Sequence, residues 1–129
     1  MEPKQPIRAI LERHGNIRLA ILFGSLASGR ATPQSDADVA IQADNPVDAG
    51  FKMALIDELA VAAGRPVDLV DLRTAGEPLL GEILKHGMRL FGSDTDYAEL
   101  IKRHVFEDAD FMPYRRRILA ERRRAWTGI

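Results

Sequence analysis

The chain has 129 residues, with 18 Lys and Arg against 19 Asp and Glu, a formal net charge of -1 and a hydrophobic fraction of 46%. This length and composition predict a single ordinary domain over residues 1–129, without disorder or a second large domain. The absence of cysteine excludes a disulfide framework, a cysteine-ligated metal centre and a thiol nucleophile. Any chemistry must therefore use oxygen, imidazole or guanidinium groups.

The first six residues are polar and lack the apolar core of a signal peptide. Nowhere does the sequence approach the roughly 18 consecutive apolar residues that a membrane span requires. We therefore expect a cytoplasmic protein with no membrane partner.

The first predicted elements are a short helix and a buried strand. Pro6 suits a first helical turn, and apolar residues recur at helical spacing from Ile7 until Gly15. Residues 17–23 form a short run rich in Ile and Leu that ends at Gly24. This run predicts a strand that is buried on both faces.

The middle of the chain predicts strand, helix and strand. The second strand begins with an Asp-Ala-Asp segment and continues through residues 39–41. Apolar residues then recur at helical spacing over 51–62, before Gly64, and residues 66–72 predict a third strand.

The last part predicts a helix, a short strand and a long helical segment. Residues 79–84 form the helix, which Gly87 stops, and residues 88–91 form the strand. A helical pattern then covers residues 94–126, with a break expected at Pro113. The order of elements predicts an α/β (α+β) fold with a central mixed four-stranded sheet flanked by helices.

The strand 17–23 runs directly into Gly24 and Ser25. Glycine lets a ligand approach the backbone where a Cβ would collide, and Ser25 adds a hydroxyl beside exposed amides. A Gly-Ser dipeptide alone is typical of a loop. Combined with the Asp-Ala-Asp segment that follows, it indicates a phosphate-binding turn.

Asp36 and Asp38 are two residues apart, so in a strand their side chains share one face, about 7 Å apart along the backbone. A divalent cation would remove the repulsion, and Mg²⁺ prefers one or two carboxylates plus phosphate oxygens. A helix cap or a solvated turn is the alternative for this pair.

The third strand carries two further carboxylates. Asp68 is the best candidate for a missing ligand, because a carboxylate in an apolar strand is costly unless it is paired or bound to a metal. A strand-edge carboxylate bonded to backbone is the alternative. Asp71 has the opposite parity, so we expect it on the far face or at the strand end.

These residues resemble the signature of the DNA polymerase β-like nucleotidyltransferases. The match consists of Gly24-Ser25, ten intervening residues, Asp36-x-Asp38 and Asp68 on a later strand. The segments 23–29, 67–72 and 87–91 are similar to the minimal nucleotidyltransferase (MNT) branch, and the resemblance covers residues 7–92.

The resemblance implies a nucleotidyltransferase fold and a Mg²⁺-dependent transfer from ATP. Asp36 and Asp38 would hold two Mg²⁺ ions, while Asp68 would help hold the catalytic metal beside the attacking hydroxyl. Gly24 and Ser25 would hold the β and γ phosphates. Arg30 follows this turn and could contact a phosphate or pyrophosphate, or could be a solvated loop arginine.

For the MNT branch, the implied partner is a HEPN ribonuclease toxin, which the MNT protein neutralises by transferring AMP to a tyrosine. Larger relatives modify antibiotics and carry an additional helical domain, for which this chain looks too short. Two alternatives remain open: neutralisation by occlusion without catalysis, and transfer to a small molecule or an RNA end.

The near-zero net charge hides a basic carboxy-terminal segment. Eight of the 18 cations fall in the last 28 residues, including Arg115–Arg117 and Arg122–Arg124, seven residues apart. These clusters could be solvated helix charges, or could bind RNA or an acidic surface on a partner. The three histidines show no metal-ligand spacing and are expected at helix surfaces or ends.

Overall fold

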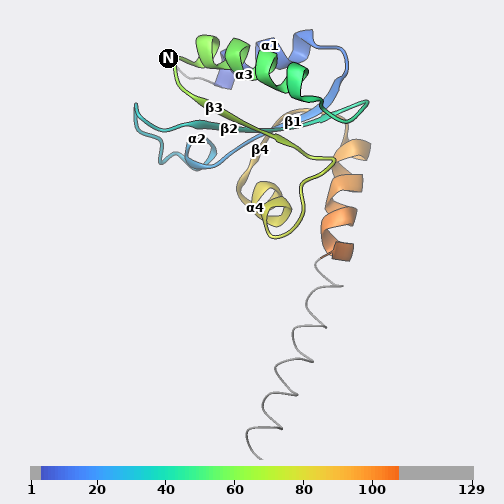
Figure 1. The fold of residues 1–129 in the computed structure, drawn as a ribbon. Coiled ribbons are helices and arrows are strands. Elements are labelled where there is room, and N and C mark those ends of the chain that lie inside the picture. Colours follow the sequence, from blue (N-terminus) through green and yellow to red (C-terminus); the bar gives the residue numbers. More distant parts are fainter. Residues whose placement is uncertain (1–3, 108–129) are drawn as a thin grey trace, which may run out of the picture.

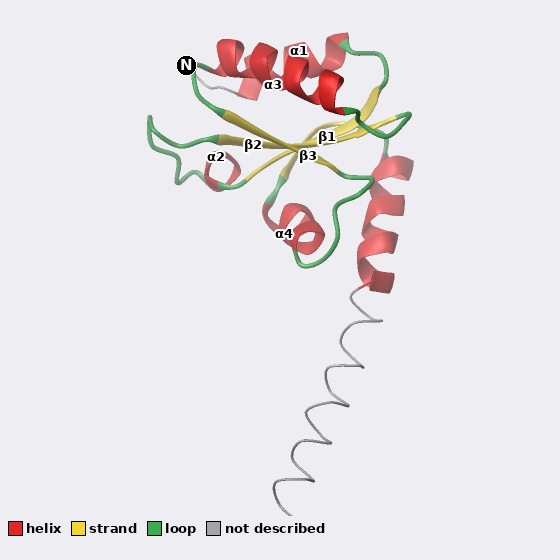
Figure 2. Ribbon diagram, in the orientation of Figure 1, coloured by secondary structure: helices red, strands yellow, loops and turns green. Residues whose placement is uncertain are grey.

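A four-stranded sheet with helices on both faces forms the core of a computed structural model, which describes residues 4–107 (Figures 1 and 2). The elements in chain order are α1 (Lys4–Arg13), β1 (Ile17–Phe23), α2 (Ser25–Ser28), β2 (Ala37–Ala43), α3 (Ala49–Ala63), β3 (Val67–Asp71), α4 (Leu79–His86) and β4 (Met88–Phe91). A last helical stretch covers residues 94–107. The expected bounds of strands 17–23 and 88–91 are confirmed.

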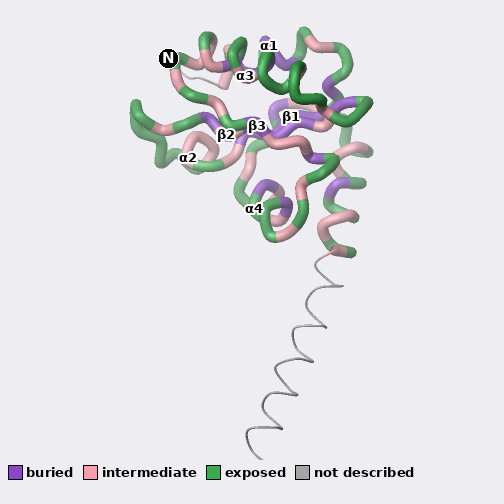
Figure 3. The backbone as a smooth tube through the Cα atoms, in the orientation of Figure 1, coloured by how far each residue is buried: buried purple, intermediate pink, exposed green. Residues whose placement is uncertain are grey.

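The sheet has the order β3-β2-β1-β4 and is mixed, as the sequence predicts. Strand β1 is antiparallel to both β2 and β4, whereas β2 and β3 are parallel. In the parallel pair, Asp38 of β2 lies in register with Asp68 of β3. The two central strands are the most deeply buried (Figure 3).

Two apolar layers cover the two faces of the sheet. Helices α1 and α3 cover one face, on which Leu11, Val39 and Leu59 pack together. Helix α4 and residues 94–107 lie on the other face, where Leu80 and Leu100 pack.

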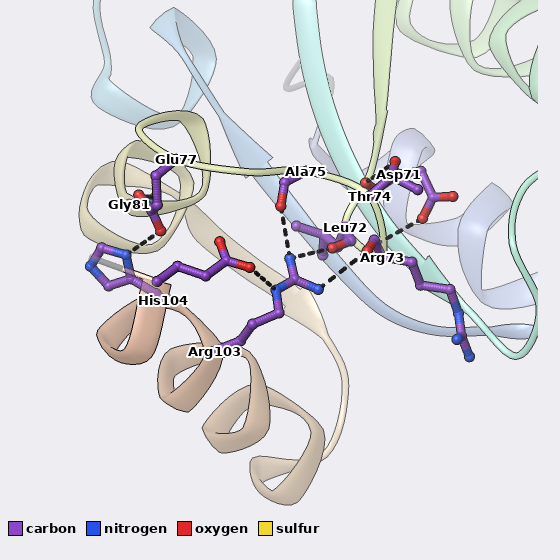
Figure 4. Close-up of polar contacts among 10 residues, drawn as sticks. Asp71, Leu72, Arg73, Thr74, Ala75, Glu77, Gly81, Arg103 and His104 are labelled. Carbon is purple, nitrogen blue, oxygen red and sulfur yellow. Dashed lines mark hydrogen bonds and ion pairs between the residues drawn. The ribbon is translucent and has the colours of Figure 1, made fainter. Parts of the chain in front are cut away.

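Two side chains attach the helical stretch 94–107 to the segment after β3 (Figure 4). Arg103 donates hydrogen bonds to the carbonyl oxygens of Leu72 and Ala75. His104 Nδ1 lies 2.5 Å from Glu77 Oε1, and the imidazole side chain is only 29% exposed. His104, expected at a helix surface or end, is therefore partly exposed and makes a tertiary contact that the sequence did not predict. His14 does the same with Glu58.

The basic clusters Arg115–Arg117 and Arg122–Arg124, and the break expected at Pro113, lie outside the described residues. Among the helices that the structure describes, none is both long enough and apolar enough to cross a membrane.

Candidate functional site

Asp38 and Asp68 project from neighbouring strands toward the face of the sheet that α4 covers. On β2, Val39 packs in the layer of α1 and α3, whereas Ala40 packs in the layer of α4. Since side chains alternate along a strand, Asp38 shares the face of Ala40. Asp68 is in register with Asp38 across the parallel pair, so the two carboxylates are neighbours on one face.

The pKa of the Asp38 carboxyl is raised above its ordinary value. Partial burial is the largest cause, and the negative charges of Asp68 and then Asp36 add to it. Asp36 lies immediately before β2 and is exposed. The three carboxylates are therefore close enough for Asp38 to experience the charge of the other two.

This set fits Mg²⁺ in its chemistry, because all three side chains offer hard oxygen ligands and their mutual repulsion favours a cation. Within residues 4–107, no group of three or more acidic, histidine or cysteine side chains is gathered closely enough to enclose an ion. The carboxylates are thus neighbours rather than a preformed cage, and bound phosphate oxygens would have to complete the coordination.

The turn after β1 brings Gly24 against Asp38. Gly24 has φ 73° and ψ -152°, a conformation that residues with a Cβ rarely adopt. A Cβ at this position would overlap Asp38 Oδ2. The Gly-Ser turn therefore lies directly beside one of the carboxylates, as the sequence predicts.

A groove of about 440 Å³ opens beside this turn. It lies between α2 and α4, and its lining residues are Phe23, Gly24, Ser25, Ser28, Arg30, Leu79, Glu82 and His86. The backbone of Arg30 is fixed to the turn, because its N–H donates to the Ser25 carbonyl at 3.0 Å. The structure thus brings Gly24, Ser25 and Arg30 together, with the three aspartates outside the lining set.

Glu82 and His86 were not expected to face this groove. Both lie on α4, with His86 Nε2 3.6 Å from Glu82 Oε2. Together with Leu79 they recur at helical spacing, which indicates one face of a helix. The sequence carries no signal that this face lies beside the Gly-Ser turn, because the two segments are more than 50 residues apart.

Asp71 has a different role from Asp68. Its Oδ2 accepts a hydrogen bond from the Val47 backbone N–H at 3.2 Å, and its Oδ1 accepts one from the Arg73 N–H at 2.9 Å. Asp71 is the last residue of β3. The prediction that Asp71 lies on the far face or at the strand end is confirmed.

A family model described as "Polymerase beta, Nucleotidyltransferase" matches residues 5–96. The chain belongs to this family. A curated member, the protein adenylyltransferase MntA of Shewanella oneidensis, is 33% identical over 90 residues, which are 70% of this chain and 65% of the relative. The chain therefore aligns with less than two thirds of that relative's length.

Solved structures of family members agree with the fold described above. A chain in a crystal structure of a toxin–antitoxin pair with AMP-PNP superposes with a TM-score of 0.81 and 28% identity, over 92% of this chain and 96% of the other. A chain in a complex of tri-AMPylated Shewanella oneidensis HEPN toxin with MNT antitoxin gives 0.75 and 26%, over 92% and 94%. The nucleotidyltransferase fold predicted from the sequence is confirmed.

Proposed function

We propose that the chain is a Mg²⁺-dependent protein adenylyltransferase. It transfers AMP from ATP to a hydroxyl group, that of a tyrosine, on a HEPN ribonuclease toxin, and so acts as the antitoxin. The observation that carries this proposal is the packing of the Gly24 turn against Asp38, itself in register with Asp68. This arrangement lies in a family whose relatives include a protein adenylyltransferase and MNT antitoxins.

In the proposed reaction, the hydroxyl oxygen of the acceptor attacks the α-phosphorus of ATP. A new O–P bond forms, the bond to the β-phosphate oxygen breaks, and pyrophosphate leaves. Asp68, the more exposed of the two paired carboxylates, accepts the proton of the hydroxyl group. Asp38 is assigned to the metal instead, because its carboxylate lies against the Gly24 turn that would hold the phosphates.

Gly24 and Ser25 would hold the β and γ phosphates. The missing Cβ of Gly24 lets this turn pack against Asp38, so phosphates held by the turn would lie beside the carboxylates. Ser25 and Arg30 both line the adjacent groove. Arg30 would contact the leaving pyrophosphate, whose negative charge increases as the bond breaks. Asp36, Asp38 and Asp68 would hold Mg²⁺, which when bound supplies positive charge against the phosphate oxygens.

Transfer of radiolabel from α-labelled ATP tests this proposal. With Mg²⁺ and a cognate HEPN toxin present, the label should appear on that toxin, and Asp36→Ala combined with Asp38→Ala should abolish it. Asp57→Ala is the matched control, because Asp57 is an exposed carboxylate of α3, on the opposite face of the sheet. Label on RNA or on a small molecule instead would favour those acceptors, and undiminished labelling by the double variant would refute the site.

Three further predictions belong to the same proposal. We expect the protein to act in the cytoplasm as a single domain. The basic segment of residues 94–126 is expected to contact the toxin or RNA. Binding to RNA would weaken steeply with salt, because phosphate contacts release counterions.

A further inference from the structure

Arg65 connects the two segments that carry the candidate metal ligands. It lies between α3 and β3, two residues before the first residue of β3. Its Nη1 donates to the carbonyl oxygens of Thr32 and Ser35, both at 3.2 Å. Ser35 directly precedes Asp36, so this guanidinium holds the loop from which that carboxylate projects.

The loop is a closed turn that Arg65 ties to the sheet. Within it, the Ser35 N–H donates to the Thr32 carbonyl at 3.0 Å, and the Thr32 N–H donates to Ser35 Oγ at 2.8 Å. The backbone beside Arg65 adds a further link, because the Ala37 N–H donates to the Pro66 carbonyl at 2.9 Å. The turn before β2 is therefore fixed to the start of β3 through both main chain and side chain.

The guanidinium of Arg65 is held in a partly dehydrated position. Its Nε is buried and has no hydrogen-bond partner among the described residues. An unpaired buried N–H costs free energy, so this position is unfavourable unless the two carbonyl contacts compensate for it. Both contacts come from one nitrogen of the guanidinium, Nη1, which donates to the two carbonyl oxygens.

We propose that Arg65 is a positioning residue for the metal site: it sets where Asp36 lies relative to Asp68. This inference rests on the proposed function. Asp36 is exposed and lies outside the hydrogen-bonded part of β2, so the strand pairing alone does not fix its position. Second-layer groups of this kind orient metal ligands and affect metal affinity.

Arg73 provides a matched control, because it makes the same kind of contact at the other end of β2. Its Nε donates to the Ala43 carbonyl at 2.9 Å and its Nη2 to the Asp44 carbonyl at 2.6 Å. Arg65 precedes β3 and Arg73 follows it. Each donates to two backbone carbonyl oxygens near one end of β2. Only Arg65 does so beside the carboxylates.

The test compares the full chain with Arg65→Gln and Arg73→Gln by titration calorimetry. AMP-PNP is titrated into each protein once in the presence of Mn²⁺ and once in the presence of a chelator. The readout is the gain in AMP-PNP affinity that the metal produces. We expect Arg65→Gln to reduce this gain about tenfold or more. Arg73→Gln should keep the gain, with a fall in melting temperature similar to that of Arg65→Gln.

Two results would overturn parts of this account separately. If Mn²⁺ raises the affinity of the parent chain for AMP-PNP, and raises that of Arg65→Gln equally, the role of Arg65 alone is refuted. No gain in the parent chain would refute the proposed metal site, and the role of Arg65 with it. If a Gln variant does not fold, Arg65→Lys and Arg73→Lys replace the pair, because lysine keeps the charge and lacks the planar guanidinium.

Discussion

Gly24 lies directly against the carboxylate of Asp38, with no room for a Cβ between them. Gly24 belongs to the turn after β1, and Asp38 belongs to β2. The strands β1 and β2 are antiparallel neighbours in the sheet. Their contact brings the candidate phosphate-binding backbone to the candidate metal ligands. It therefore joins two motifs that are 14 residues apart in the sequence into one site.

Replacement of this glycine tests the contact. Gly24→Ala should reduce AMP transfer about 100-fold, because the added methyl group displaces either the turn or Asp38. Gly29→Ala is the control, since Gly29 also has a positive φ of 76° but nothing lies within 4 Å of its missing Cβ. Both variants should lose about 1–3 kcal/mol of stability through backbone strain. Equal activity of the two variants in the transfer assay would contradict the contact.

The two aspartates of β3 should respond differently to the same substitution. Asp68→Asn should reduce transfer about 10²–10⁴-fold with little change in the free energy of unfolding, because the residue is exposed. Asp71→Asn should instead lose about 1–2 kcal/mol of stability, because it accepts two backbone hydrogen bonds. Transfer assays and urea unfolding measure the two effects. If Asp71→Asn reduced transfer and Asp68→Asn reduced stability, the roles assigned to the two aspartates would be wrong.

Ionised Asp38 should destabilise the fold at neutral pH. The pKa of this carboxyl is raised in the folded state, above the ordinary value of 3.8, by burial and then by Asp68 and Asp36. The protonated form is thus favoured by folding, and this favourable contribution is lost as the pH rises through the folded-state pKa. Asp38→Asn should therefore have the higher melting temperature at pH 7, and its advantage should shrink as the pH falls toward 3.8.

Mg²⁺ gives an independent check on the same carboxylate. Its addition at neutral pH should raise the melting temperature of the parent chain more than that of Asp38→Asn, because binding to the folded state stabilises it. If Asp38→Asn is less stable than the parent chain at pH 7 without metal, the inferred repulsion among the three carboxylates is wrong.

Arg103 should hold the segment after β3 in place. Arg103→Met removes hydrogen bonds to the carbonyls of Leu72 and Ala75 and should reduce stability by about 1–3 kcal/mol. Amides of residues 72–76 should then exchange hydrogen faster. Arg8→Met is the control, because among residues 4–107 Arg8 makes only an exposed i,i+4 pair with Glu12, which contributes a few tenths of a kcal/mol. Unchanged exchange in the Arg103 variant would show that the segment after β3 is held without these two hydrogen bonds.

The sequence was sufficient to predict the four strands, although the second was expected to include Asp36 and begins one residue later, at Ala37. Strand 17–23 is apolar on both faces and ends at a glycine, so its bounds follow from composition and turn chemistry. That Asp68 shares the face of Asp38, and that Asp71 does not, follows from the two-residue period of strands once the strands are assigned. The register that pairs Asp38 with Asp68 comes from the structure.

The polar contacts that position the site could not be predicted in the same way. Arg65 bonds carbonyl oxygens 30 and 33 residues earlier, and Arg103 bonds those of Leu72 and Ala75. Backbone acceptors exist at every residue, so no side-chain pattern marks which of them an arginine will reach. For the same reason His104 looked like a surface residue, although it contacts Glu77.

The most direct test of the central proposal is the intact mass of a cognate HEPN toxin after incubation with the chain, ATP and Mg²⁺. The account predicts a mass increase of one or more AMP groups with the parent chain, loss of the ribonuclease activity, and neither effect with Asp36→Ala plus Asp38→Ala. A HEPN protein that is neutralised with unchanged mass, by the parent and the double variant alike, would contradict adenylylation and show occlusion instead.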